Sequence, residues 1–194
     1  ARESILEDSA PQKPCELDHS YPVLPLPTKQ PRVEFGDTAP PFSPSASGPN
    51  LEIADHGYRA TRVRGCRQSV AVGAAPLPFQ THGRYFEIQV EDTVPGWVGG
   101  LGIGTTLTSP SELKRIPDKA WRIPKSSVVG YWGCAFLDGE EFRTSWRADS
   151  LHPGARVGFL VTQAGDIVLF VDGETVLQVQ AAVPAEDLDQ PLYP

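Results

Sequence analysis

The sequence predicts an all-β protein, a two-sheet antiparallel β-sandwich preceded by an extended proline-rich N-terminal arm. Three observations lead to this fold class. Polar and apolar residues alternate with a period of two along residues 84–90 and 99–105, which is typical of strands. Turn signals recur at the even spacing of a sandwich. Ten of the 20 prolines lie before Leu51, and no segment predicts a helix of useful length.

The arm takes residues 1–49, where the prolines exclude helix and disfavour sheet. We expect it to be extended and polyproline-like, with apolar residues that anchor it to its own domain or to a partner. Its proline-poor stretch, residues 32–35, alternates polar and apolar residues. We expect this stretch to lie along the sandwich and to cover a sheet edge.

Residues 50–194 form the sandwich, for which we expect about nine strands. Asp55-His56-Gly57 and Asp172-Gly173 are turn signals that predict hairpins. A single helical turn is expected over residues 111–114. The expected strands span residues 51–54, 58–63, 68–72, 84–90, 97–105, 127–136, 156–162, 166–171 and 174–179.

Glycines mark the strand expected over residues 97–105. Gly100, Gly102 and Gly104 occupy every second position, with apolar residues between them. This period of two, with no helix following, argues against a G-x-G-x-x-G phosphate loop. Glycine weakens a strand unless another group approaches the backbone closely. We therefore expect an aromatic ring, from Trp132 or Trp97, to lie across the bare face.

The composition restricts the partners and the compartment. A net charge of -7 and a pI near 5.1 argue against nucleic acid and anionic membranes as main partners. No apolar run approaches the roughly 18 residues of a spanning helix, so we expect no membrane insertion. The chain has no methionine, which suits a processed product or a fragment. Cys15, Cys66 and Cys134 favour an intracellular reducing compartment, including an organelle reached through a cleaved targeting peptide.

No residue pattern predicts catalysis, a metal site or a cofactor. The four histidines lie in the arm or in expected turns and show no metal-ligand spacing. No G-x-S-x-G nucleophile motif occurs. The acidic pairs Glu91-Asp92 and Glu140-Glu141 fall in expected turns, where solvated loop ends are the simpler interpretation. We therefore expect a protein that is not an enzyme.

Several motifs together resemble the SPRY domain and its relative, the Neuralized homology repeat. Val157-Gly158 followed by the F-x-D-G hairpin at residues 170–173 is similar to the SPRY signature. The A-x-R at residues 60–62, Pro76-Leu77, the W-x-G-x-L-x-I-G-x-T at residues 97–106 and the VP…LY at residues 183–193 resemble the Neuralized repeat. The resemblance implies a SPRY- or concanavalin-like jelly roll over residues 50–194 that binds proteins without catalysis.

Two departures from the family pattern carry expectations of their own. The LY pair normally opens a last strand, whereas this chain stops at Pro194, so we expect that strand to be missing. The family includes ubiquitin ligases with a cysteine-rich zinc module, which three cysteines cannot build.

Clusters of aromatic residues and arginines supply the candidate partner-binding residues. Trp and Arg dominate binding hot spots, and loops on a rigid sandwich are where such sites form. Trp121 and Arg122 lie between prolines, outside any expected strand, and Arg143 and Arg147 are weaker candidates. The alternative for the remaining tryptophans, Trp97, Trp132 and Trp146, is burial in the core.

Three functions remain open on the sequence alone. The first is a protein–protein interaction module that grips a partner protein or peptide with its sandwich loops. The second is an accessory structural subunit of a larger complex, tethered by its proline-rich arm. The third is a carbohydrate-binding, lectin-like sandwich, which would need calcium-binding acids or a stacking aromatic over a polar pocket.

Overall fold

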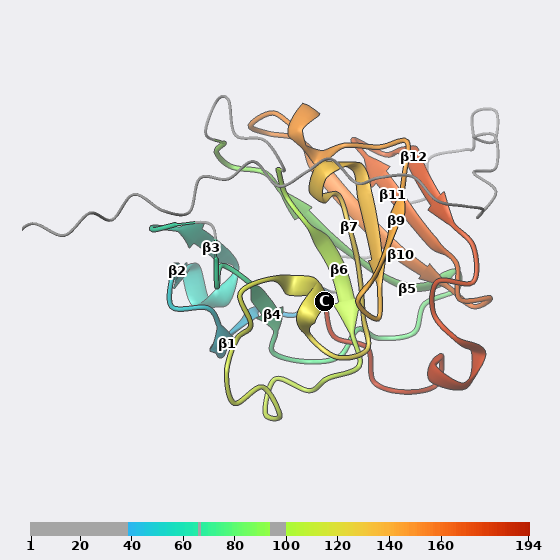
Figure 1. Ribbon diagram of the computed structural model, residues 1–194, viewed down its shortest axis with the longest axis horizontal. Helices are drawn as coiled ribbons and strands as arrows, with labels where there is room; N and C mark the ends of the chain where they lie inside the picture. The colour runs from blue at the N-terminus through green and yellow to red at the C-terminus, as the bar shows by residue number, and fades with distance from the viewer. Residues whose placement is uncertain (1–38, 66, 94–99) are drawn as a thin grey trace, which may run out of the picture.

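The computed structural model describes residues 39–65, 67–93 and 100–194, and in these ranges the chain is almost entirely β. Two four-stranded antiparallel sheets lie face to face, and two short two-stranded ladders stand at one side of them (Figure 1). No α-helix occurs in the described ranges, where the five helical segments are 3-10 turns of three residues each. The predicted all-β antiparallel sandwich is confirmed.

The first sheet has the order β12-β11-β10-β5, with β10 in its interior. Val157, Phe159 and Val161 of β10 point to one face and are at most 2% exposed, so they form the centre of the core. The strands expected here from alternation and from the Asp172-Gly173 turn are confirmed. Their bounds are β5 (Gly83–Gln89), β10 (Arg156–Thr162), β11 (Ile167–Val171) and β12 (Glu174–Val179).

The second sheet has the order β6-β7-β8-β9 and packs its inner face on the first. Ile103, Val129 and Ala135 are Cα partners across three strands, and all three belong to the core. Val128 and Phe136, one position along, therefore point to the outer face. The strands are β6 (Ile103–Thr106), β7 (Ser126–Val129), β8 (Cys134–Leu137) and β9 (Glu140–Arg143).

The two small ladders pair β1 (Phe42–Ser47) with β4 (Ala71–Gly73), and β2 (Leu51–Ala54) with β3 (Arg59–Arg62). The predicted turn at Asp55–Gly57 joins β2 to β3. Ala46, Val72 and Ile123 form a second, smaller hydrophobic cluster beneath the β1–β4 ladder.

Both ends of the described domain differ from expectation. Strand β1 begins at Phe42, inside the range assigned to the arm, and tolerates Pro44 because its ladder is irregular between Phe42 and Ser47. At the other end, Tyr193 exchanges two backbone hydrogen bonds with Thr106 of edge strand β6, at 2.8 and 2.9 Å. The chain end therefore covers part of the edge expected to be unpaired. Residues 32–35, predicted to cover an edge, lie outside the described residues.

The sequence predicts one continuous strand over residues 127–136, and this prediction is wrong because the structure interrupts the strand in its middle. The 3-10 turn η3 (Tyr131–Gly133) separates β7 from β8. Gly130, Trp132 and Gly133 have φ angles of 116°, 52° and 74°, so the backbone reverses where an apolar run suggested a continuous strand. Strand β9 begins at Glu140-Glu141, where the sequence predicts a turn, and residues 111–114 form no helix.

Candidate protein-binding surface

The outer face of the second sheet carries a stack of aromatic rings. Phe136 of β8 points to this face and is 3% exposed. The 3-10 turn η2 (Ala120–Arg122) lays Trp121 over it, with ring centroids 4.3 Å apart and an interplanar angle of 9°. Burial of a large aromatic area holds η2 on the sheet, since no side chain caps the turn.

The reversal at η3 adds two further rings to this stack. Tyr131 and Trp132 meet Trp121 edge to face, at centroid distances of 5.2 and 5.6 Å. Tyr131 and Trp132 also contact each other at 5.7 Å. We call Trp121, Tyr131, Trp132 and Phe136 the aromatic cluster. Its inner ring is buried, whereas Trp132 is 37% exposed, so the cluster presents an apolar surface to solvent.

Gly102 makes room for the cluster. A Cβ atom at Gly102 would lie 1.9 Å from Cε2 of Tyr131, so only glycine admits the ring. An aromatic ring against Gly102 was expected, but the structure places Tyr131 there instead of Trp132, and Trp97 lies outside the described residues. The expectation is wrong for Gly104 and Gly100, which meet the backbone of Ser127 and of Ala148.

Tyr131 is held in an apolar environment. Burial raises the pKa of its hydroxyl, while Arg62 and a backbone hydrogen bond with Gly102 act against that rise. Arg62 belongs to β3, so the β2–β3 ladder contributes a positive charge near the cluster. At neutral pH the phenol is therefore uncharged, and Tyr131 contributes an apolar ring with one polar atom, its hydroxyl oxygen, to the cluster.

Positive charge borders the exposed ring. The Lys119 Nζ lies 5.5 Å from the ring centroids of both Trp121 and Trp132, within the range of cation–π attraction. The stem of Arg147 lies beside η3, since a Cβ at Gly133 would be 3.0 Å from its Cγ. The Arg147 guanidinium pairs with Asp149 at 2.7 Å, and this hydrogen bond raises the Arg147 pKa.

The structure places the four candidate residues as follows. Trp121 is the centre of the aromatic cluster, and Arg122 is exposed beside it in η2. Arg147 borders η3, and Arg143 is exposed on β9, opposite Cys134 of β8. Trp121 and Arg147 are thus brought to the same turn, although 26 positions separate them in the sequence.

Sequence reasoning missed three members of this surface, Lys119, Tyr131 and Trp132. The sequence analysis gave burial in the core as the alternative for both Trp132 and Trp146. Trp146 is buried, at 8% exposure, whereas Trp132 is exposed. The missed signal is the pair of glycines, Gly130 and Gly133, that flank Tyr131-Trp132. Such a pair marks a reversal that turns two rings outward.

Other site types find little support in the described ranges. No group of three or more His, Cys, Asp or Glu side chains there could hold a metal ion. No helix in those ranges is long and apolar enough to cross a membrane.

The two packed antiparallel sheets, with 3-10 turns over one outer face, define a β-sandwich domain. The family model described as Neuralized matches residues 42–194, so the chain belongs to the Neuralized family. This domain is a Neuralized homology domain, a protein-interaction module. Nothing in the described structure or the comparisons favours the accessory-subunit or the carbohydrate-binding alternative.

Known relatives agree with this assignment. The chain is 30% identical over 177 residues to mouse "E3 ubiquitin-protein ligase NEURL1B", covering 88% of this chain and 30% of that protein. It is 32% identical over 71 residues to human "Neuralized-like protein 2", covering 37% of this chain and 24% of that protein. The chain thus spans less than a third of the curated relatives it matches.

The fold is also that of solved Neuralized domains. The crystal structure of the Drosophila melanogaster Neuralized NHR1 domain superposes with a TM-score of 0.61 at 18% identity, covering 81% of this chain and 89% of that one. The solution structure of the NHR domain of Drosophila Neuralized gives a TM-score of 0.59 at 18% identity, with coverages of 83% and 86%.

Proposed function

We propose that the aromatic cluster and the cations around it form the partner-binding surface of this domain. The observation that carries the proposal is Trp132, a large indole left 37% exposed on a stack whose other rings are better covered. Because the exposed ring is already held by the buried rings around it, little side-chain entropy is lost when a partner covers it. Tryptophan is also the residue type most enriched at binding hot spots.

The cations define the rim of the surface. Lys119 lies 5.5 Å from the exposed indole, and the Arg147 stem lies beside Gly133, the residue after Trp132. Arg122 follows Trp121 in η2, and Arg143 is paired with Cys134 on the neighbouring strand. Rim charges steer association and orient a partner more than they add affinity. The expected partner is a protein segment that places an apolar side chain on Trp132 and carbonyl or carboxylate oxygens toward the rim.

Binding without catalysis is part of this proposal. The surface is formed by rings and cations, and the Cys134 thiol beside it, which donates to Glu141 Oε1 at 3.2 Å, is inaccessible at 1% exposure. The NEURL1B relative that is titled a ligase is more than three times as long as the matched region. The acidic composition, with a net charge of -7, supports a protein partner over nucleic acid.

The division of the chain is proposed in the same way. We place the start of the interaction domain at about Phe42, because β1 pairs with β4 and the family model begins there. The residues before it are proposed to be the proline-rich arm.

Selection of peptides tests the proposal. Phage-displayed random peptides are panned against the full chain, and the selected peptides are then tested against the double variant Trp121→Ala/Arg122→Ala. We expect at least about a tenfold loss of affinity, as for a hot-spot truncation. Circular dichroism verifies that the double variant is folded. Unchanged affinity in a folded double variant would exclude this surface as the binding site.

A further inference from the structure

Two side chains on the outer face of the first sheet are nearly as well buried as the core. Val157, Phe159 and Val161 of β10 point inward, so Leu160 points outward. Tyr85 of β5 is the Cα partner of Leu160 and shares its face. Leu160 is 6% exposed and Tyr85 is 7% exposed. Side chains on an open sheet face stay in contact with water, so this low exposure indicates a covered surface.

Apolar neighbours extend this surface across three strands. Val168 of β11 is the Cα partner of Leu160, and Phe170 meets the Tyr85 ring edge to face at 6.3 Å. Tyr85 also lies over Gly158, where a Cβ would be 2.3 Å from the tyrosine hydroxyl oxygen. We call Tyr85, Leu160, Val168 and Phe170 the outer patch. Two aromatic and two aliphatic side chains thus form one strip across β5, β10 and β11.

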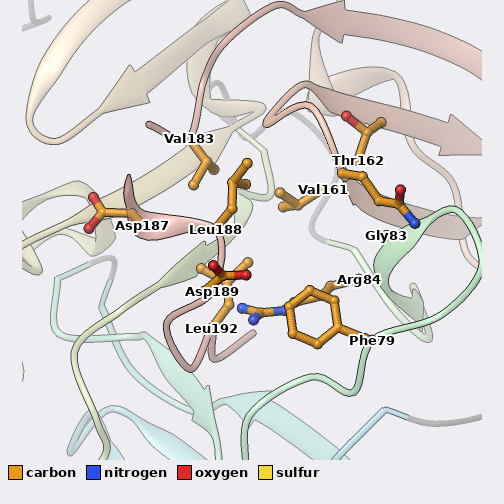
Figure 2. Close-up of a pocket in the computed structure, with 11 residues that line it drawn as sticks. Phe79, Gly83, Arg84, Val161, Thr162, Val183, Asp187, Leu188, Asp189 and Leu192 are labelled. Carbon is orange, nitrogen blue, oxygen red and sulfur yellow. The ribbon is translucent and has the colours of Figure 1, made fainter. Parts of the chain in front are cut away.

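No element of the described ranges packs on the outer patch. The second sheet lies on the opposite side of the first, beyond the shared core. The two small ladders stand at the side of the sandwich (Figure 1). The segment after β12 covers the inner face, where Figure 2 shows Val183 and Leu188 beside Val161 at a cavity of about 290 Å³. The cover therefore comes from the rest of the chain or from another molecule.

The polar groups beside the outer patch indicate what kind of cover fits. The Tyr85 hydroxyl donates to Glu87 Oε2 at 3.0 Å, and Arg156 Nε donates to Glu87 Oε1 at 2.6 Å. These groups satisfy one another, and the rest of the patch is apolar. Because a charge buried here would have no partner, the occupant needs apolar side chains and no charge.

Residues 21–27, Tyr-Pro-Val-Leu-Pro-Leu-Pro, have this composition. They lie within residues 19–28, the longest stretch before Ala39 without Asp, Glu, Lys or Arg. Their three prolines lack the N–H that pairing with a sheet edge requires. A polyproline segment can still lay its side chains on the face of a sheet. The sequence of this segment therefore suits a face rather than an edge.

The connection to the described domain is long enough. Ala39 packs on the main hydrophobic core, so the chain leaves the described domain from the sandwich itself. From Pro27 to Ala39 there are 12 residue steps, which span up to about 37 Å at about 3.1 Å per residue. The two sheets are about 10 Å apart, and β10, with 7 residues, is about 23 Å long. The outer patch is therefore within reach of residues 21–27.

We propose that residues 21–27 bind the outer patch of the same chain, as an apolar strap across β5, β10 and β11. The leucines and prolines of the segment replace water over the four side chains of the patch. The proline-rich arm then serves its own domain instead of tethering another subunit, and this face of the sheet is closed to partners. The proposal does not depend on the aromatic cluster, and it stands if that surface binds nothing.

Methyl nuclear magnetic resonance of the full chain tests the strap directly. With leucine and valine methyl groups labelled, we expect nuclear Overhauser effects from the outer patch to Leu24 and Leu26. In a mixture of labelled and unlabelled chains, an isotope-filtered spectrum distinguishes contact within one chain from contact between two copies. Absence of these effects, or effects that arise only between copies, would overturn the proposal.

A matched pair of variants supplies a second measurement. Leu24→Asp/Leu26→Asp places two charges on the strap and should lower the Tm by at least about 4 °C, because a carboxylate is costly to bury. Ile5→Asp/Leu6→Asp makes the same change elsewhere in the arm and should leave the Tm within about 1 °C. Equal shifts in the two variants would count against the strap. If the first variant fails to fold, the Overhauser effects of the unmodified chain still decide.

Discussion

Replacing Gly102 by alanine should disrupt the aromatic cluster by displacing the ring of Tyr131, which packs on Gly102. Gly102 has a backbone conformation that any residue adopts, so the substitution adds only a methyl group. That methyl would lie 1.9 Å from Cε2 of Tyr131 and 2.3 Å from its Cζ. Since van der Waals contact needs more than 3.4 Å, the Tyr131 ring must leave its position.

The cost can be worked out from the contacts that the ring makes. Overpacking a filled site costs about 1–3 kcal/mol. Tyr131 also pairs with Trp121 and Trp132, and each aromatic pair contributes about 0.5–1.5 kcal/mol. With partial relaxation, the free energy of unfolding should fall by about 2–4 kcal/mol. For a domain of this size the Tm should fall by about 5–12 °C.

Chemical denaturation of four proteins measures this effect as a double-mutant cycle. In a Tyr131→Ala background, Gly102→Ala should cost less than about 0.5 kcal/mol, because the ring that it strikes is gone. Gly104→Ala is the matched control, since its methyl would meet the Ser127 backbone oxygen at 2.1 Å, which Tyr131→Ala cannot relieve. An equal cost of Gly102→Ala in both backgrounds would refute the reasoning.

Three further predictions concern the core, the rim and pH. Phe159→Ala removes a ring that is 0% exposed and should lower the free energy of unfolding by about 3–5 kcal/mol in denaturant titrations. Arg147→Ala should leave the denaturation midpoint essentially unchanged, because its ion pair with Asp149 is exposed; a clear shift would show a structural role. Burial raises the pKa of Tyr131 above its ordinary value of 10.0, so its contribution to stability is present below pH 10 and is lost as pH rises further. Thermal unfolding at pH 9 and pH 11 should therefore show a smaller fall in Tm for Tyr131→Phe than for the unchanged chain, and an equal fall would contradict the assignment.

Much of the first sheet could be predicted because its signals are local. The alternation of Val157, Phe159 and Val161 and the Asp172-Gly173 turn specify β10 to β12 within a short stretch of chain. Alternation decides which face is buried, and a tight turn decides the register.

The candidate surface could be predicted only in part, because it depends on contacts between distant segments. Trp121 was selected for its proline-flanked position, but nothing local shows that Phe136 lies beneath it. The left-handed backbone at Trp132 overrides the strand preference of the apolar run around it. The burial of Leu160 and Tyr85 on the outer face could likewise not be predicted, because alternation tells which side chains share a face but not what covers them.

The central claim is that the exposed indole of Trp132 is where this Neuralized domain contacts its protein partner. Isothermal titration calorimetry with the tightest selected peptide tests it, using the full chain, Trp132→Ala and the exposed-aromatic control Tyr58→Ala. We predict that Kd rises at least about tenfold for Trp132→Ala and less than about twofold for Tyr58→Ala. An unchanged Kd for Trp132→Ala, or a larger loss for Tyr58→Ala, would contradict the claim.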